Sequence, residues 1–355
     1  MSNWTPNMEK ALRKIAAKTI KSKLMDHGKP FILSHFVTHH CMCKCASCLW
    51  KNNDWGDVPL EDLKRFYLEA KAAGFIAVGI TGGEPFLRKD LGELVKFIKE
   101  EAKMSILLIN TGWFLKKRMD EVLPYIDMMI ISLDSAKPER HDQIRGLPTL
   151  YQTLMDGLIL AKQKYPHVSY QFNCCVQKGI GKEIDDLIAL AEKMDVKISF
   201  DVITEARNGE NDSKFTATSQ GLPLPELIDI CKHLALRKSE GAPIVNSQHY
   251  FQYFAEGRKG YTCHFPKVLM CVDGRGNVED CLNLDRPIAN IRNMPLTKIM
   301  TLPRFKQLRV DAEACSSCNS PTMVDISQVW QRPQIIFQRE GIQLSQTVES
   351  GAKAL

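Results

Sequence analysis

The chain has 355 residues, of which 44% are hydrophobic and 25% are charged. This composition is typical of a globular protein with a sizeable core and excludes a disordered chain. The sequence contains no run of about 18 uncharged apolar residues, so no transmembrane helix is expected. The first 30 residues lack the pattern of a signal peptide, so we expect a cytoplasmic protein. The net charge of +6 is too small to indicate a nucleic-acid partner.

The twelve cysteines are many for a chain with no export signal, and they are unevenly spread. Four lie within residues 41–48, and a later group ends at Cys315 and Cys318. Thiols stay reduced in the cytosol, so clustered cysteines there predict metal or catalytic groups rather than disulfides.

The first predicted element is a helix over residues 8–25, within an N-terminal segment of residues 1–30. Apolar residues such as Leu12 and Ala16 recur at helical spacing, and lysines make the opposite face basic. We expect this amphipathic helix to pack on the body of the protein with its basic face in solvent. The alternative is an interfacial helix, which would make the protein peripheral at the inner face of the membrane.

From residue 31, short apolar runs alternate with amphipathic stretches. Strands are predicted at 31–37, 75–80, 105–109, 128–133, 168–176 and 196–202. Helices are predicted at 60–73, 90–103, 114–124, 150–164 and 183–194. This alternation predicts an α/β fold with a parallel sheet, and six such units predict a partial (β/α)6 TIM-like barrel over residues 31–206. Functional groups in such sheets gather at the carboxyl ends of the strands.

The remainder of the chain is divided by composition. Residues 207–260 are predicted to be a polar linker followed by a helix near 223–238. An apolar run at 268–272, the turn residues Asp273–Asn277 and the segment Val278–Leu282 predict a hairpin. The hairpin lies within residues 261–320, which we expect to be a small α+β unit. A tail follows over 321–355, whose apolar stretch at 323–330 is expected to pack across the barrel mouth.

The first chemical motif is the spacing Cys41-x3-Cys45-x2-Cys48, directly after the first predicted strand. Three thiolates this close along a loop can hold one face of an iron–sulfur cubane and leave the fourth iron without a protein ligand. Zinc is the alternative, with Cys43 or His40 as a fourth ligand.

The second motif, Gly82-Gly83-Glu84-Pro85, directly follows the second predicted strand. Two glycines at a strand end let a ligand approach bare backbone, and Glu84 supplies an anion for an ammonium group. Taken alone, the segment would instead be interpreted as a strand-to-helix turn with Glu84 facing solvent.

In this order and separation, the two motifs resemble those of the radical S-adenosylmethionine (radical SAM) enzymes, and the resemblance extends to about residue 205. It implies a [4Fe–4S] cluster on Cys41, Cys45 and Cys48 whose open iron chelates SAM. It also implies that SAM is bound by Gly82, Gly83, Glu84, Pro85, Ser132, Asp134, Arg145 and Asn173. Within this set, Ser132 and Asp134 would contact the ribose and Arg145 would pair with the SAM carboxylate. Ser47 departs from the family, which has an aromatic residue before the last cluster cysteine.

The later cysteines resemble the twitch extension, a shortened relative of the SPASM domain that follows many radical SAM barrels. That resemblance implies an auxiliary [4Fe–4S] cluster on Cys263, Cys281, Cys315 and Cys318. For Cys271 there are two alternatives: it is a strand residue, or it replaces Cys263 as a ligand. Zinc is the alternative metal. Cys174, Cys175 and Cys231 are interpreted as core residues.

The resemblance implies reductive cleavage of SAM to a 5′-deoxyadenosyl radical, which removes hydrogen from an unactivated carbon. We expect a lipid or small-metabolite substrate and a reductant such as flavodoxin or ferredoxin. A peptide substrate is the alternative among enzymes. A two-cluster electron carrier or iron–sulfur redox sensor is the alternative outside them, although such carriers ligate each cluster with four residues.

Overall fold

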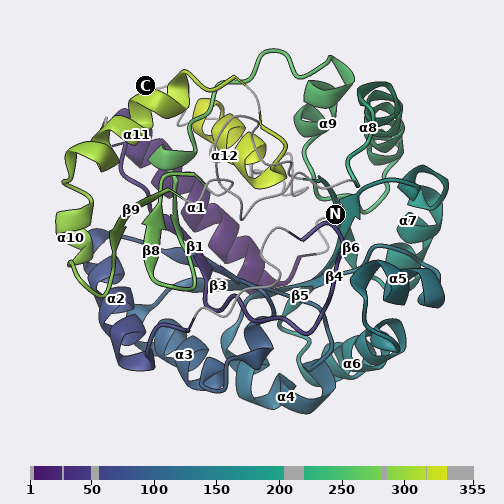
Figure 1. Cartoon of the computed structure of the whole chain (residues 1–355), viewed down its shortest axis with the longest axis horizontal. Helices are drawn as coiled ribbons and strands as arrows, with labels where there is room; N and C mark the ends of the chain where they lie inside the picture. Colours follow the sequence, from purple (N-terminus) through teal and green to yellow (C-terminus); the bar gives the residue numbers. More distant parts are fainter. Residues whose placement is uncertain are drawn as a thin grey trace.

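The computed structural model describes residues 4–25, 28–48, 56–203, 220–281, 286–316 and 318–333. Its centre is a nine-stranded sheet in the order β6-β5-β4-β3-β2-β1-β7-β8-β9 (Figure 1). The strands are β1 Ile32–Phe36, β2 Ala77–Thr81, β3 Ser105–Asn110, β4 Met128–Ser132, β5 Ser169–Val176, β6 Lys197–Val202, β7 Leu269–Val272, β8 Asn277–Glu279 and β9 Pro287–Asn290.

Most of the helices pack around the outside of this sheet, and α2 to α7 form an outer arc in Figure 1. The helices are α1 Pro6–Leu24, α2 Leu60–Ala73, α3 Leu91–Phe97, α4 Leu115–Val122, α5 Pro138–Arg145, α6 Leu150–Lys164, α7 Ile184–Lys193, α8 Leu224–Ser239, α9 Gln248–Ala255, α10 Leu296–Ile299, α11 Pro303–Glu313 and α12 Pro321–Gln331. The predicted α/β class with a parallel, barrel-like sheet is confirmed. Helices α5 and α9 to α12 were not predicted.

The six strands β1 to β6 are parallel and lie in sequence order. Alternate residues such as Leu33, Leu108 and Ile131 are buried in the main core, as expected where helices cover the outer face of the sheet. The carboxyl ends of all six strands therefore meet at one edge, where the loops that carry the predicted motifs begin.

The predicted hairpin is part of the same sheet. Strand β7 pairs in parallel with β1, which places Cys271 opposite Ser34, and β8 and β9 continue the sheet in antiparallel fashion. Because β1 and β7 run in the same direction, the turn after β7 lies beside the cysteine loop after β1.

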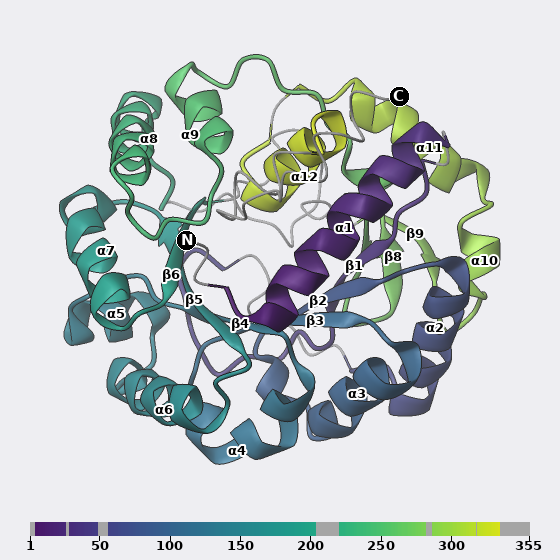
Figure 2. The same cartoon turned by 180° about the vertical axis from the view of Figure 1, so that it is seen from behind.

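Helix α1 crosses the back of the barrel (Figure 2). Its apolar residues Leu12 and Ala16 pack with Met128 at the amino end of β4. The Thr5 and Ser169 hydroxyls lie 2.9 Å apart and join its start to β5. The prediction of a packed helix is confirmed. The interfacial interpretation is not supported, because the apolar face that would enter lipid covers the amino-terminal end of the barrel. No helix in the described ranges is long and apolar enough to cross a membrane.

Helix α12 lies in the segment that was predicted to be a tail. Just before it, the Asn319 side chain donates to the Ile203 carbonyl at the carboxyl end of β6 (3.1 Å). At its other end, Trp330 packs with Phe31 and Val268 beside the amino ends of β1 and β7. The apolar stretch at 323–330 therefore runs from one end of the barrel to the other, rather than across its mouth.

A buried histidine behind the sheet predicts how stability depends on pH. His35 Nδ1 lies 2.7 Å from the Tyr67 hydroxyl. Burial, followed by the nearby Arg88 charge, lowers the pKa of His35 to about 3. In the unfolded chain the pKa is about 6.5, so the unfolded state binds more protons between these values and stability falls as pH falls through that window.

Because of this histidine, we expect the unfolding free energy to decrease by about 2 kcal/mol when the pH is lowered from 7 to 5. His35→Asn keeps a hydrogen-bonding group for Tyr67 but does not titrate. Over the same pH range, the decrease in unfolding free energy should therefore be about 2 kcal/mol smaller in the variant than in the wild type. Urea unfolding of both proteins at the two pH values measures the difference. An identical pH dependence would contradict the assignment.

Candidate active site

The cysteine loop, residues 37–48, follows β1 at the carboxyl edge of the sheet and is fastened to the turn after β2. The Gly83 amide donates to the Thr38 carbonyl (2.9 Å), and the Glu84 amide donates to the His40 carbonyl (2.8 Å). The two sequence motifs are therefore joined directly by backbone hydrogen bonds.

The glycine pair exists because the cysteine loop passes so close. A Cβ atom on Gly82 would lie 2.1 Å from the Thr38 carbonyl oxygen, and one on Gly83 would lie 2.2 Å from that of His40. From the sequence, we predicted that these glycines let a ligand approach the backbone. In the structure, the missing side chains make room for the cysteine loop itself.

Two further glycines receive the loop from other elements. Gly146 ends α5 with a φ of 61°, and a Cβ there would lie 2.9 Å from Lys44 Cβ. A Cβ on Gly274, in the turn after β7, would lie 2.7 Å from His39 Cδ2. The Lys44 amide also donates to the Arg145 carbonyl (2.9 Å). The loop is thus held between the ends of β2, α5 and β7.

The thiols of this loop lie close to one another. The Cys43 thiol hydrogen-bonds with those of Cys41 and Cys45, which raises the pKa of Cys43. The hydrogen bond with Cys43, together with the Arg145 charge, lowers the pKa of Cys45 to about 6. The Cys48 amide donates to the Cys45 carbonyl at 3.3 Å, so the third motif cysteine belongs to the same turn.

The donor set decides which metal group the loop suits. Thiolates are soft ligands that favour iron–sulfur clusters or zinc. A structural zinc ion needs four ligands around one point. No three His, Cys, Asp or Glu side chains within the described part of the chain are grouped to hold one ion. A cubane binds each thiolate at a different iron, so three thiols spread along one loop fit it better.

Glu84 is fully buried, so the interpretation of a solvent-facing turn is wrong. Its Oε1 accepts from the Phe86 amide (3.0 Å), and its Oε2 accepts from the Thr111 amide (2.8 Å) and hydroxyl (2.5 Å). Burial raises the pKa of Glu84, and these donors oppose the rise. The carboxylate therefore braces the turn after β2 against the end of β3. Its contact with an ammonium group stays a prediction.

Asp134 and Arg145, both assigned to SAM, form an ion pair with 2.6 Å between Asp134 Oδ2 and Arg145 Nε. Asp134 Oδ1 also accepts from the Cys175 amide at 2.9 Å. Arg145 Nη1 lies 4.0 Å from Cys45 Sγ. The pair therefore connects the ends of β4, β5 and α5 with the cysteine loop, and its contacts to SAM stay predictions.

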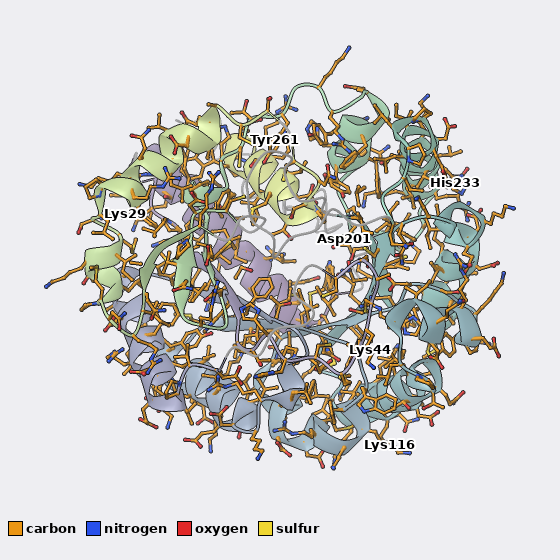
Figure 3. All side chains as sticks on the ribbon, in the orientation of Figure 1. Lys29, Lys44, Lys116, Asp201, His233 and Tyr261 are labelled. Atoms are coloured by element: carbon orange, nitrogen blue, oxygen red, sulfur yellow. The ribbon has the colours of Figure 1, made fainter. Side chains whose placement is uncertain are left out.

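Ser132, the last residue of β4, is the register partner of Asn173 within β5, and Ser199 on β6 continues the row. The Asn173 amide lies 2.5 Å from Ser199 Oγ and 3.0 Å from Asp201 Oδ2, and the orientation that satisfies both has its nitrogen donating. Figure 3 places Asp201 on the inner side of the ring of helices. Sequence reasoning missed Ser199 and Asp201, although their two-residue spacing in a predicted strand put them on one face.

The four auxiliary cysteines assigned from sequence lie near one another. The Cys263 amide donates to the Cys315 carbonyl at 3.3 Å. Burial, and then the neighbouring Cys281, Cys263 and Cys315, raise the pKa of Cys318 to about 12. Cys271 is a buried residue of β7 whose thiol is also influenced by Cys281 and Cys263. It occupies a strand position, as the first alternative expected.

Comparison with known proteins agrees with this geometry. Residues 37–194 match the family model described as the radical SAM superfamily. The chain is 24% identical over 318 residues to the AdoMet-dependent heme synthase of Methanosarcina barkeri, covering 81% of this chain and 87% of the relative. It is 28% identical over 204 residues to GTP 3′,8-cyclase of Helicobacter pylori, covering 55% of this chain and 60% of the relative.

Two solved structures share the fold. SuiB of Streptococcus suis, bound to its precursor peptide SuiA, has a TM-score of 0.64 at 19% identity. The match covers 82% of this chain and 70% of the SuiB chain. The anSMEcpe protein with bound AdoMet has a TM-score of 0.62 at 15% identity. The match covers 87% of this chain and 96% of the anSMEcpe chain.

The match over the barrel and the joined motifs define the class. The chain carries a radical SAM domain over residues 37–194 and, like the relatives that match it by sequence, is an enzyme. Members of the family use a [4Fe–4S] cluster and SAM, which fits the thiol loop and the turn beside it.

The glycine pair gives a test of this architecture. Gly83→Ala places a methyl group against the His40 carbonyl, so the cysteine loop must move. We expect a loss of about 1–3 kcal/mol in unfolding free energy and less iron bound after anaerobic reconstitution. Gly79→Ala, on the strand β2 that precedes the turn, is the matched control, because its Cβ would meet no atom closer than 3.8 Å. Equal iron content and stability in the two variants would refute the close approach.

Proposed function

We propose that this radical SAM enzyme holds its cluster on Cys41, Cys45 and Cys48 and acts on a small metabolite inside the barrel. When bound there, the cluster and SAM supply a 5′-deoxyadenosyl radical that removes hydrogen from an unactivated carbon. The observation that carries the proposal is the cysteine loop hydrogen-bonded to the Gly82–Gly83 turn at the carboxyl edge of the sheet.

The residues of the chain have separate tasks in this proposal. Gly82, Gly83, Glu84 and Pro85 hold the turn that carries SAM's amino acid part, with Glu84 fixed by Thr111. Asp134 and Arg145 place charge beside Cys45. Ser132 and Asn173 offer hydrogen bonds at the strand ends. Fixed polar groups of this kind orient a reactant without reorganising during the reaction.

A small metabolite is favoured over a lipid by two observations. The apolar face of α1, which would enter lipid in the interfacial alternative, packs against the amino-terminal end of the barrel. The inner face of β5 and β6 carries a connected polar row in which Gln171 donates to Ser199 and Asn173 contacts Asp201. Polar groups placed in this way select a ligand with complementary hydrogen bonds. The relatives matched by sequence are also named for small molecules, heme and GTP.

We further propose an auxiliary [4Fe–4S] cluster on Cys263, Cys281, Cys315 and Cys318. Cys263 precedes β7, Cys281 follows β8, and Cys315 and Cys318 precede α12. Four thiols would complete the ligand set of a cluster, unlike the three of the first loop. A small reductant protein such as flavodoxin or ferredoxin would supply the electrons.

Cysteine variants test both cluster sites. Cys45→Ala removes a ligand from the open-corner cluster, so SAM cleavage should fall to background. Cys318→Ala should lower total iron by about half. Iron quantitation and 5′-deoxyadenosine release with dithionite and SAM measure the two effects in anaerobically reconstituted protein.

Two matched variants serve as controls. Cys43→Ala should keep iron and SAM cleavage, because Cys43 is not a ligand in the proposal. Cys231→Ala, a buried cysteine on α8, should keep full iron. Loss of iron in Cys43→Ala would mean that this thiol caps the fourth iron, and unchanged iron in Cys318→Ala would rule out the auxiliary cluster.

The substrate class has its own test. A radical that removes deuterium from its substrate carries the label into 5′-deoxyadenosine. We expect label when the enzyme is given the aqueous small-molecule fraction of cells grown in deuterated medium. The lipid and peptide fractions are the controls. Label that comes from either control fraction and not from the aqueous one would contradict a small-metabolite substrate.

A further inference from the structure

The turn of the auxiliary hairpin contacts the cysteine loop of the radical SAM site. Strands β1 and β7 are paired from Ile32–Leu269 to His35–Val272. The cysteine loop leaves β1 and the turn Asp273–Asn277 leaves β7 at the same edge of the sheet. The two segments that lead to the two sets of cysteines therefore leave the sheet as neighbours.

His39 makes the contact between them. It is 2% exposed, and its Nε2 accepts a hydrogen bond from the Gly274 amide at 2.9 Å. An acceptor nitrogen carries a lone pair, so this imidazole is neutral with its proton on Nδ1. A Cβ on Gly274 would lie 2.7 Å from His39 Cδ2, so the two residues are also in close steric contact.

The turn presents the Gly274 amide from a fixed position. Asp273 Oδ1 accepts from the Arg275 and Asn277 amides at 2.9 and 2.8 Å, and the Asp273 amide donates to the Asn277 carbonyl at 2.8 Å. Past the turn, β8 leads toward Cys281, while β7 carries Cys271. A donor held this firmly positions its acceptor, in the way that outer residues orient metal ligands.

We propose that His39 is a positioning residue that locks the cysteine loop of the radical SAM site to the auxiliary hairpin. The lock holds the two iron–sulfur sites in a fixed relation, and it sets the orientation of the loop two residues before Cys41. Its consequence for the clusters rests on the proposed function. The lock itself is a contact between two segments of this chain and can be tested separately.

Hydrogen exchange of the full reconstituted chain tests the lock. His39→Ala should raise amide exchange in residues 37–44 and 273–277 at least tenfold. His39→Gln should restore protection, because its side-chain oxygen can replace Nε2 as the acceptor. Gly56→Ala is the control, since a Cβ there meets no atom within 4 Å. Unchanged exchange in His39→Ala, or no rescue by Gln, would overturn the proposal.

A double variant tests the steric side of the contact. Gly274→Ala alone should raise exchange in both segments, because its methyl group overlaps the imidazole. In the His39→Ala background the two imidazole contacts are gone and only the 3.2 Å approach to the Thr38 carbonyl carbon remains, so the second substitution should add less than it does in the wild type. Fully additive effects would show that the two residues act independently and would overturn the lock.

Electron paramagnetic resonance connects the lock to the clusters. The reduced wild type should show a change in its cluster signal when SAM is added. In His39→Ala this change should weaken or broaden with iron content unaltered, and His39→Gln should recover it. An unaltered SAM response in His39→Ala would refute the positioning role. If the wild type shows no SAM response, the proposed function fails while the exchange experiments still decide the lock.

Discussion

The site depends on one steric constraint, the close passage of the cysteine loop over the Gly82–Gly83 turn. Carbonyl oxygens of the loop occupy the space where two Cβ atoms would otherwise lie. This contact allows the amides of Gly83 and Glu84 to bond the loop backbone directly. The cysteines are therefore placed by main-chain geometry, and the thiols remain available for a metal group.

Buried charge surrounds this backbone core, and each charged group has defined partners. Glu84 accepts three hydrogen bonds, and Asp134 joins Arg145 and the Cys175 amide. Isolated charges are costly to bury, whereas paired and hydrogen-bonded ones hold a specific geometry. The elements that supply these partners are the ends of β3, β4, β5 and α5. Three neighbouring strand ends and one helix end thus cooperate to fix one loop.

The sequence was informative where a pattern is local. All six strands of the barrel were predicted close to their observed bounds, because buried parallel strands are continuous apolar runs. Helix α5 was missed, although Pro138 at its start and Gly146 after its end are a local start-and-stop signal. The glycine pair was predicted as part of the site, but its contact with the cysteine loop was not, because the residues that it contacts lie more than 40 positions away in sequence.

Long-range pairing was the part that the sequence could not reveal. Nothing local marks β7 as a partner of β1, or His39 as an acceptor for Gly274, since both depend on how distant segments meet. The same is true of α12, whose apolar residues fit equally a packed helix and a surface stretch. The alternation of residues alone placed Ser199 and Asp201 on one face of β6. Their contact with Asn173 depends on the neighbouring strand and could not be predicted.

An open six-stranded barrel leaves two strand edges unpaired, and the chain covers both. Strand β7 pairs with the free edge of β1. On the other side, Ile198 bridges to Ile244, and the Asn246 amide both accepts from and donates to the Phe200 backbone, as a strand would. Exposed edges are prone to unwanted pairing. The region after the barrel thus completes the sheet at whose carboxyl edge the cysteine loop lies, and Cys281 follows β8 of the same sheet.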